Sequence, residues 1–197
     1  SSDNPLALND SNPGEISMST GGVGRNIAEN LSRISIASKI FSYVGSDALG
    51  EFLIEKTQSA NVDTSYIKKH SSLPTSQYLS VLDDSNDMLV SISDMRIIDE
   101  MSIEDMKSWG NTLNQSAVIV VDTNIPTKLI QYITDKYSHI PLFLDPVSIA
   151  KTSKIIDIIG KFHTVKPNRL EAELITGIKI IDNQSMLKAA QNIFDKG

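Results

Sequence analysis

The sequence lacks cysteine altogether, in a chain of 197 residues. This absence excludes a disulfide framework and a zinc site built on thiolates, and it is typical of a reducing compartment. Histidine is scarce as well, and His70, His139 and His163 do not have the spacing of metal ligands. No nucleophile motif joins a serine to any of them. We therefore expect neither a thiol- or histidine-based metal site nor a serine hydrolase.

Long apolar runs and an excess of basic charge are also missing. No apolar stretch approaches the roughly 20 residues of a membrane span, and residues 1–10 lack the basic and apolar regions of a signal peptide. Lysine and arginine number 18 against 24 acidic residues, so the net charge of −6 opposes broad capture of nucleic acid. We expect a cytoplasmic protein with small-molecule partners, no membrane and no nucleic acid polymer.

What the sequence does contain is a repeated succession of strand and helix patterns. Short apolar runs at 117–121 and 142–144 are typical of buried strands in a parallel sheet, and 40–44 and 163–165 are weaker examples. Helical spacing follows such runs, with Pro126 as a start signal and Gly177 as a stop signal. The pattern predicts a doubly wound α/β domain that binds ligands beyond the carboxyl ends of its strands.

One segment departs from this succession. Residues 77–82 and 88–92 alternate as strands do, and they flank the polar run 83–87. They predict an antiparallel hairpin inserted into the α/β domain.

A glycine-rich turn precedes the first predicted helix, at residues 21–28. Gly21, Gly22 and Gly24 permit close approach of a ligand to the backbone, and Asn26 offers both a donor and an acceptor to a hydroxyl-rich ligand. A tight turn that starts a helix explains the glycines equally well.

A wider pattern surrounds this turn. Gly21, Gly22, Gly24, Asn26 and Ala28, followed by Ser35 and Gly45, meet every fixed position of the first signature of the PfkB, or ribokinase-like, carbohydrate kinases. Residues 44–50 resemble the V-G-x-D-x-x-G element of the same family. Further stretches resemble one nucleoside-kinase branch of it, and they lie at 10–14, 78–83, 88–90, 93–95, 145–148 and 163–173.

A second polar segment follows the last predicted strand. Asn168 and Glu171 have the spacing of a capping box at a helix start. The resemblance offers another role, because the family carries an N-x-x-E motif here that holds phosphate-bound Mg²⁺, usually through water. Oxygen ligands and retained water suit Mg²⁺. The two roles are compatible, because the carboxylate sits at a helix N-terminus.

Polar residues also follow two central strands. Asp122 and Asn124 come after one, and Asp145 follows the other. We interpret Asp122 as a turn former. By resemblance, Asn124 aligns with a position that contacts the sugar, and Asp145 lies near the phosphates.

The resemblance implies a ribokinase-like three-layer αβα sandwich with a small β-sheet lid, of which 1–197 is an incomplete fragment. The lid segments would be about 10–20 and 73–98. The first strand would precede Ser1, and the D-T-x-G-A-G-D segment, with the catalytic base and ATP loop, would follow Gly197.

The activity implied is transfer of the ATP γ-phosphoryl group to a hydroxyl of a sugar or nucleoside. ATP and Mg²⁺ would be cofactors, activation by a monovalent cation is left open, and two lids would pair in a homodimer. Two alternatives stay open: another sugar kinase of the same family, of the ribokinase or fructokinase type, and a non-catalytic sugar- or nucleoside-binding module of the same fold. The implied site has a substrate side at Gly21, Gly22, Gly24, Asn26 and Asn124, a phosphate side at Asp145, Lys166 and Asn168, and a Mg²⁺ position at Glu171.

Overall fold

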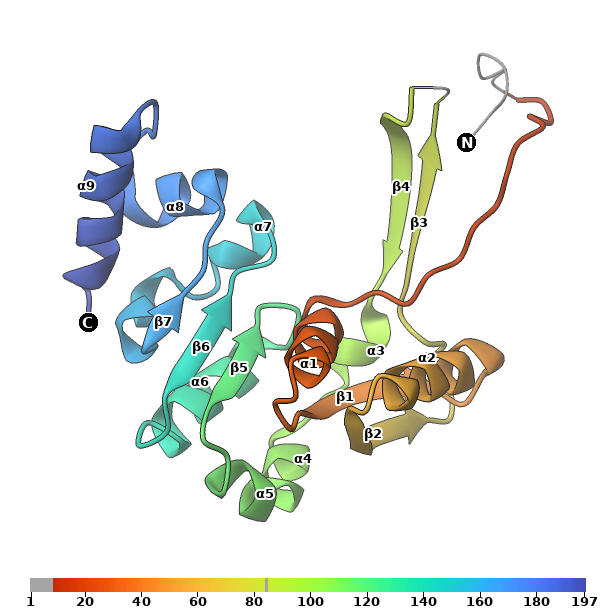
Figure 1. The fold of residues 1–197 in the computed structure, drawn as a ribbon, viewed down its shortest axis with the longest axis horizontal. Helices are drawn as coiled ribbons and strands as arrows, with labels where there is room; N and C mark the ends of the chain where they lie inside the picture. The colour runs from red at the N-terminus through yellow and green to blue at the C-terminus, as the bar shows by residue number, and fades with distance from the viewer. Residues whose placement is uncertain (1–8, 84) are drawn as a thin grey trace.

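The computed structural model describes residues 9–83 and 85–197 (Figure 1). The start of the predicted domain 1–197, at residues 1–8, and Asp84 in the predicted lid lie outside these described residues.

A three-stranded parallel sheet forms the centre of the molecule. Its strands are β5 (Ile119–Asp122), β6 (Leu142–Asp145) and β7 (Thr164–Val165), in that order across the sheet. Alternate residues of β5 and β6 are buried, as expected for strands that pack a core on at least one face. These strands confirm the runs predicted at 117–121, 142–144 and 163–165, with boundaries shifted by one or two residues.

Helices pack around this sheet. The buried side of α6 (Thr127–Lys136) is formed by Leu129, Ile130 and Ile133. Pro126 caps its start and Gly177, with a φ of 71°, ends α8, so both predicted signals are confirmed. The other helices on this part of the chain are α4 (Ile103–Ser108), α5 (Gly110–Asn114), α7 (Ile149–Thr152), η1 (Ile156–Lys161), α8 (Arg169–Thr176) and α9 (Asn183–Phe194).

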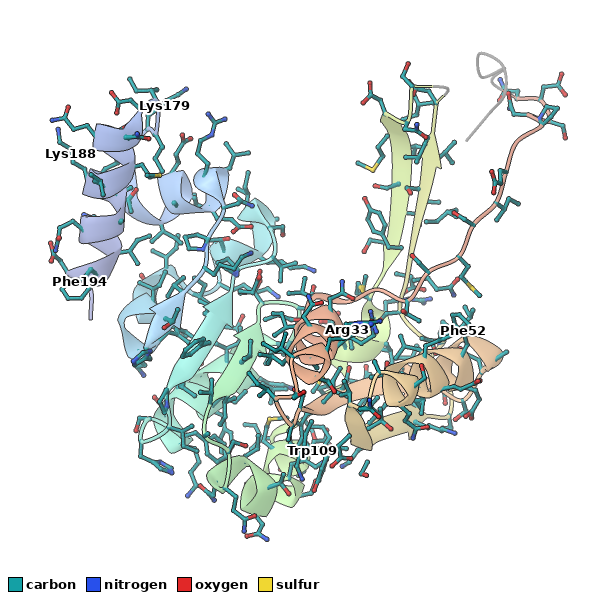
Figure 2. All side chains as sticks on the ribbon, viewed as in Figure 1. Arg33, Phe52, Trp109, Lys179, Lys188 and Phe194 are labelled. Carbon is teal, nitrogen blue, oxygen red and sulfur yellow. The ribbon has the colours of Figure 1, made fainter. Side chains whose placement is uncertain are left out.

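A second pair of parallel strands lies beside the three-stranded sheet. It consists of β1 (Lys39–Gly45) and β2 (Asp63–His70), joined by α2 (Ala48–Ser59). The helix α1 (Val23–Arg33) contacts both β1 and β5, and Figure 1 shows it between the two sheets. The aromatic rings of Phe41 and buried Trp109 are 5.3 Å apart between centroids, and their contact joins β1 to the core. Figure 2 shows Trp109 near α4 and α5.

A buried carboxylate holds the second strand pair to α4. The Asp105 side chain accepts hydrogen bonds from Tyr43 on β1, Lys68 on β2 and Ser102 before α4. Burial raises the pKa of the Asp105 carboxyl, but the hydrogen bonds from Lys68, Tyr43 and Ser102 outweigh it and hold the pKa at about 2.

We expect acid to remove the stability that the Asp105 carboxylate contributes to the fold. The folded pKa lies below the ordinary value of about 3.9, so the carboxylate stabilises the fold fully above about pH 4. About 2 kcal/mol is lost as the pH falls from about 4 to about 2. Urea unfolding of the full-length protein across this range should show a shallower pH slope for Asp105→Asn than for wild type. Equal slopes would show that Asp105 does not link folding to protons.

The predicted hairpin is present as β3 (Gln77–Leu82) and β4 (Met88–Asp94), followed by α3 (Arg96–Asp99). It extends away from the sheets, with the chain before α1 on the same side of the molecule (Figure 1). Its large apolar side chains are between 37% and 64% exposed, so no other described part of this chain covers them. These exposed residues are Tyr78, Leu79, Val81, Met88, Leu89, Val90 and Ile92.

The V-G-x-D-x-x-G segment anchors the base of this hairpin. Asp47 caps α2 by accepting from the Gly50 N–H, and it also accepts from the N–H and hydroxyl of Thr75, two residues before β3. The hydrogen bonds from Thr75, reinforced by Gly50, hold the pKa of the Asp47 carboxyl below its usual range. The Gly45 N–H donates to the Thr75 hydroxyl. The segment is therefore a structural junction between β1, α2 and the hairpin.

Candidate functional site

The carboxyl ends of the three central strands form a continuous polar edge. Asp122 and Asp145 are register partners at the ends of β5 and β6. Lys166 follows β7, and its Nζ lies 3.6 Å from the Asp145 Oδ2. Because Lys166 is 83% exposed, this ion pair leaves most of its ammonium facing solvent. The structure thus brings together the two predicted phosphate-side residues Asp145 and Lys166.

The glycine turn meets this edge at the end of β5. The Gly24 N–H donates to the Asp122 Oδ2 over 3.2 Å, and a Cβ on Gly24 would lie 3.4 Å from the same oxygen. Gly22 has a φ of 99°, which favours glycine. The other Asp122 oxygen accepts from the Asn124 N–H, as expected of a turn former. Asp122 therefore holds the start of α1 against the sheet, a contact that the sequence did not predict.

Arg25 ties the glycine turn together from inside. It is 7% exposed, and its guanidinium donates to the main-chain oxygens of Thr20 and Gly21 and to the side chains of Glu29 and Asn26. Sequence reasoning missed this role, because an arginine early in an amphipathic helix reads as a surface residue. Asn26 itself is exposed, as a ligand contact requires.

The loop after β5 carries the second predicted sugar contact. The Asn124 side-chain oxygen accepts a hydrogen bond from the Lys151 ammonium on α7. Thr123 beside it is fully buried and donates to the Pro146 oxygen, which fastens this loop to the one after β6.

The loop after β6 holds a strained residue. Val147 has a φ of 64°, unusual for a β-branched side chain, and its N–H donates to the Asp145 Oδ1. Strained backbone of this kind concentrates at functional sites.

The start of α8 lies at the far end of the polar edge. Asn168 and Glu171 form both hydrogen bonds of a capping box, at 2.8 and 3.0 Å, so the predicted cap is confirmed. Glu171 is 2% exposed, and only its Oε2 is used in the cap, which leaves Oε1 without a hydrogen bond to any residue that the structure describes.

This arrangement fits magnesium held indirectly. The described residues contain no group of three or more acidic or histidine side chains able to hold a metal ion. Mg²⁺ commonly keeps several waters and takes one or two carboxylates together with phosphate oxygens. The free oxygen of Glu171, at a helix start that favours phosphate, suits this role.

Glu171→Gln separates the two roles of this residue. A glutamine also serves in a capping box, so we expect the free energy of unfolding to change by about 1 kcal/mol or less. Loss of the carboxylate charge should raise the Mg²⁺ concentration needed for half-maximal turnover of the full-length protein. Unchanged Mg²⁺ dependence with normal kcat would leave Glu171 as a cap alone.

The predicted site residues therefore share one edge of the sheet, from the glycine turn across β5 and β6 to α8. No helix within the described ranges is both long and apolar enough to cross a membrane.

Comparison with known proteins adds a family to this geometry. Residues 2–197 match the family described as pfkB family carbohydrate kinase. The chain is 41% identical over 184 residues to the pseudouridine kinase of Escherichia coli K12, covering 92% of this chain and 58% of that protein. It is 25% identical over 181 residues to the ribokinase of Haemophilus influenzae, covering 90% of this chain and 58% of that protein.

Solved structures confirm the predicted ribokinase-like fold. A carbohydrate kinase from Agrobacterium tumefaciens matches 99% of this chain and 62% of its own length, with a TM-score of 0.86 and 23% identity. The ribokinase of Thermotoga maritima matches 100% of this chain and 64% of its own length, with a TM-score of 0.83 and 19% identity. The chain thus spans about three-fifths of the length of these relatives.

Proposed function

The chain belongs to the pfkB family of carbohydrate kinases, and from this premise we propose that its protein phosphorylates the 5′-hydroxyl of pseudouridine with ATP. The observation that carries the choice of substrate is the 41% identity to a pseudouridine kinase, against 25% to a ribokinase.

The polar edge divides into two sides in this proposal. Gly21, Gly22, Gly24, Asn26 and Asn124 bind the ribose. On the other side, Asp145, Lys166 and Asn168 face the phosphates. Transfer of a phosphoryl group requires mainly positioning and stabilisation of charge, which a lysine and a helix start both supply.

Glu171 would hold Mg²⁺ through water, and the bound ion would neutralise charge that develops on the phosphates. The base that takes the hydroxyl proton would come from the D-T-x-G-A-G-D segment predicted beyond Gly197. Closure of the lid would exclude water, which competes with the sugar as acceptor.

A coupled assay of ADP release by the full-length protein tests the proposal. We expect a higher kcat/KM with pseudouridine than with ribose or fructose. Faster turnover of ribose or fructose would assign the protein to another kinase of the family. Binding of pseudouridine with no turnover, in a protein without an intact D-T-x-G-A-G-D segment, would make it a binding module.

The hairpin supports a further part of the proposal, a homodimer through the lid. Leu79 pairs with Ile92 and Val81 with Val90, so the outer part of one face of the hairpin is apolar, while the polar pair Gln77 and Asp94 lies at its base. The opposite face carries Ser80, Ser91 and Ser93 beside Tyr78 and Leu82. A two-stranded hairpin is only marginally stable alone, and its exposed apolar face needs a partner. We assign the apolar face to the second lid and the hydroxyl-bearing face to the substrate.

Two aspartate substitutions test the two faces. Val81→Asp places a charge on the apolar face and should give monomers by light scattering. Leu82→Asp, its control on the other face, should leave the mass unchanged and raise KM for the nucleoside about tenfold or more. A wild-type protein that is monomeric at high micromolar concentration would defeat the assignment.

A further inference from the structure

The two asparagines assigned to the ribose share a feature that the family motif does not explain. The Oδ1 of Asn26 accepts from the Arg25 guanidinium, and the Oδ1 of Asn124 accepts from the Lys151 ammonium. The two contacts come from different elements, because Arg25 lies in α1 and Lys151 in α7.

These contacts determine how each amide is turned. Arginine and lysine side chains have hydrogen-bond donors but no acceptor, so only the oxygen of an amide can face them. The NH₂ group must then point the other way. Neither Nδ2 makes a hydrogen bond to a residue within 9–83 or 85–197, so both NH₂ groups remain available to a ligand.

Arg25 is held firmly enough to impose this orientation. Its guanidinium is buried and makes four hydrogen bonds. One of these is also the salt bridge to Glu29, at 2.6 Å. Arg33, labelled in Figure 2, pairs with the same Glu29, and its side chain is 66% exposed. The only hydrogen bond to the Asn26 Oδ1 among the described residues comes from Arg25. Lys151 has no carboxylate partner among the described residues, so Asn124 is its main contact.

We propose that Arg25 and Lys151 are positioning residues that present Asn26 and Asn124 to the substrate as hydrogen-bond donors. The inference rests on the proposed function and deepens it. Oxygens of the ligand accept hydrogen bonds from the NH₂ groups of Asn26 and Asn124. The hydroxyl protons of the ligand are donated to acceptors elsewhere in the site. Hydroxyl-bearing sugars meet this demand, whereas an ammonium on an amino sugar has no acceptor to offer and is excluded.

Binding of pseudouridine to the full-length protein, measured by calorimetry without ATP, tests the positioning role. Arg25→Met should raise the Kd about tenfold or more while kcat at saturation falls less than threefold. Arg33→Met is the matched control, because it also removes a partner of Glu29, and it should leave the Kd within twofold. Arg25→Lys keeps a donor and should recover part of the lost affinity.

Lys151→Met should raise the Kd in the same way. Its control is Lys154→Met from the adjacent turn, since Lys154 donates to the main-chain oxygen of Thr123 and not to an asparagine.

Asn26→Asp keeps the inference testable if Arg25→Met fails to fold. The aspartate retains the shape of the side chain and strengthens the contact to Arg25, so the thermal midpoint should not fall. Its missing NH₂ should still raise the Kd about tenfold or more, as Asn26→Ala does. Normal binding by Asn26→Asp alongside weak binding by Asn26→Ala would overturn the donor role while leaving the proposed function intact.

Equal effects of Arg25→Met and Arg33→Met would reduce Arg25 to a partner of Glu29 and overturn its positioning role. A protein that binds no pseudouridine in its wild-type form fails the proposed function instead. The same variants are then measured with the sugar that the assay identifies, and their binding of that sugar tests the donor role.

Discussion

Asn26→Ala in the full-length protein is expected to raise KM for the sugar or nucleoside about 10- to 100-fold. The amide lies in the first turn of α1 behind the glycine turn, and its NH₂ is unused by the described protein. Losing a hydrogen bond while leaving a ligand oxygen unpaired costs about 1.4–2.8 kcal/mol, which corresponds to that change. Steady-state kinetics with the nucleoside varied at saturating ATP provides the measurement, and KM for ATP should stay within about twofold.

Asn30→Ala is the matched control for this result. Asn30 is exposed one turn further along α1 and should leave KM within about twofold. If Asn26→Ala instead unfolds, and its folded fraction binds substrate normally, Asn26 is only a structural residue at the helix start.

Gly50→Ala is expected to lower the free energy of unfolding by about 3 kcal/mol or more. Helix propensity alone would favour alanine over glycine, so the loss would come from steric overlap. A Cβ on Gly50 would lie 2.4 Å from the Gly45 main-chain oxygen and 2.9 Å from the Thr75 hydroxyl. Neither contact is relieved by turning a long side chain, because one is backbone and the other oxygen is held by Asp47. Urea unfolding of the full-length protein measures the change.

Gly110→Ala tests whether the effect belongs to that junction. Gly110 begins α5, and a Cβ there would meet the Tyr137 hydroxyl at 3.5 Å, an ordinary contact. This substitution should be neutral or stabilising by up to about 1 kcal/mol. If Gly50→Ala proved as benign as Gly110→Ala, the V-G-x-D-x-x-G segment would not be the rigid base of the hairpin.

The elements predicted correctly have regular local patterns. The runs at 117–121 and 142–144 are apolar throughout, a pattern typical of strands buried on both faces of a parallel sheet. The strands are present, but Val118 and Val120 are 42% and 39% exposed, so the described residues cover one face of β5 more fully than the other. The strands of the hairpin alternate and flank a polar turn, which an isolated antiparallel pair requires. By contrast, β2 (Asp63–His70) was missed, because half-exposed residues such as Lys68 and Lys69 leave it without a clear alternation.

The candidate site divides in a similar way. Its glycines and Asn26 follow a spacing that can be read along the chain, and the capping box of Asn168 and Glu171 spans only three residues, so its chemistry is local. The contact between Gly24 and Asp122 joins positions 98 residues apart, and no local pattern predicts it.

The sequence by itself determined β1, the three central strands, the hairpin, the glycine turn and the cap of α8, because each depends on periodicity or short spacing. Only the tertiary structure decided which polar groups meet. Arg25 is buried and donates hydrogen bonds to the glycine turn, because the turn folds back over its side chain. Lys151 contacts Asn124 because β5 and β6 end side by side. Hydrogen bonds between distant segments depend on the packing of the whole sheet, and no local sequence pattern predicts that packing.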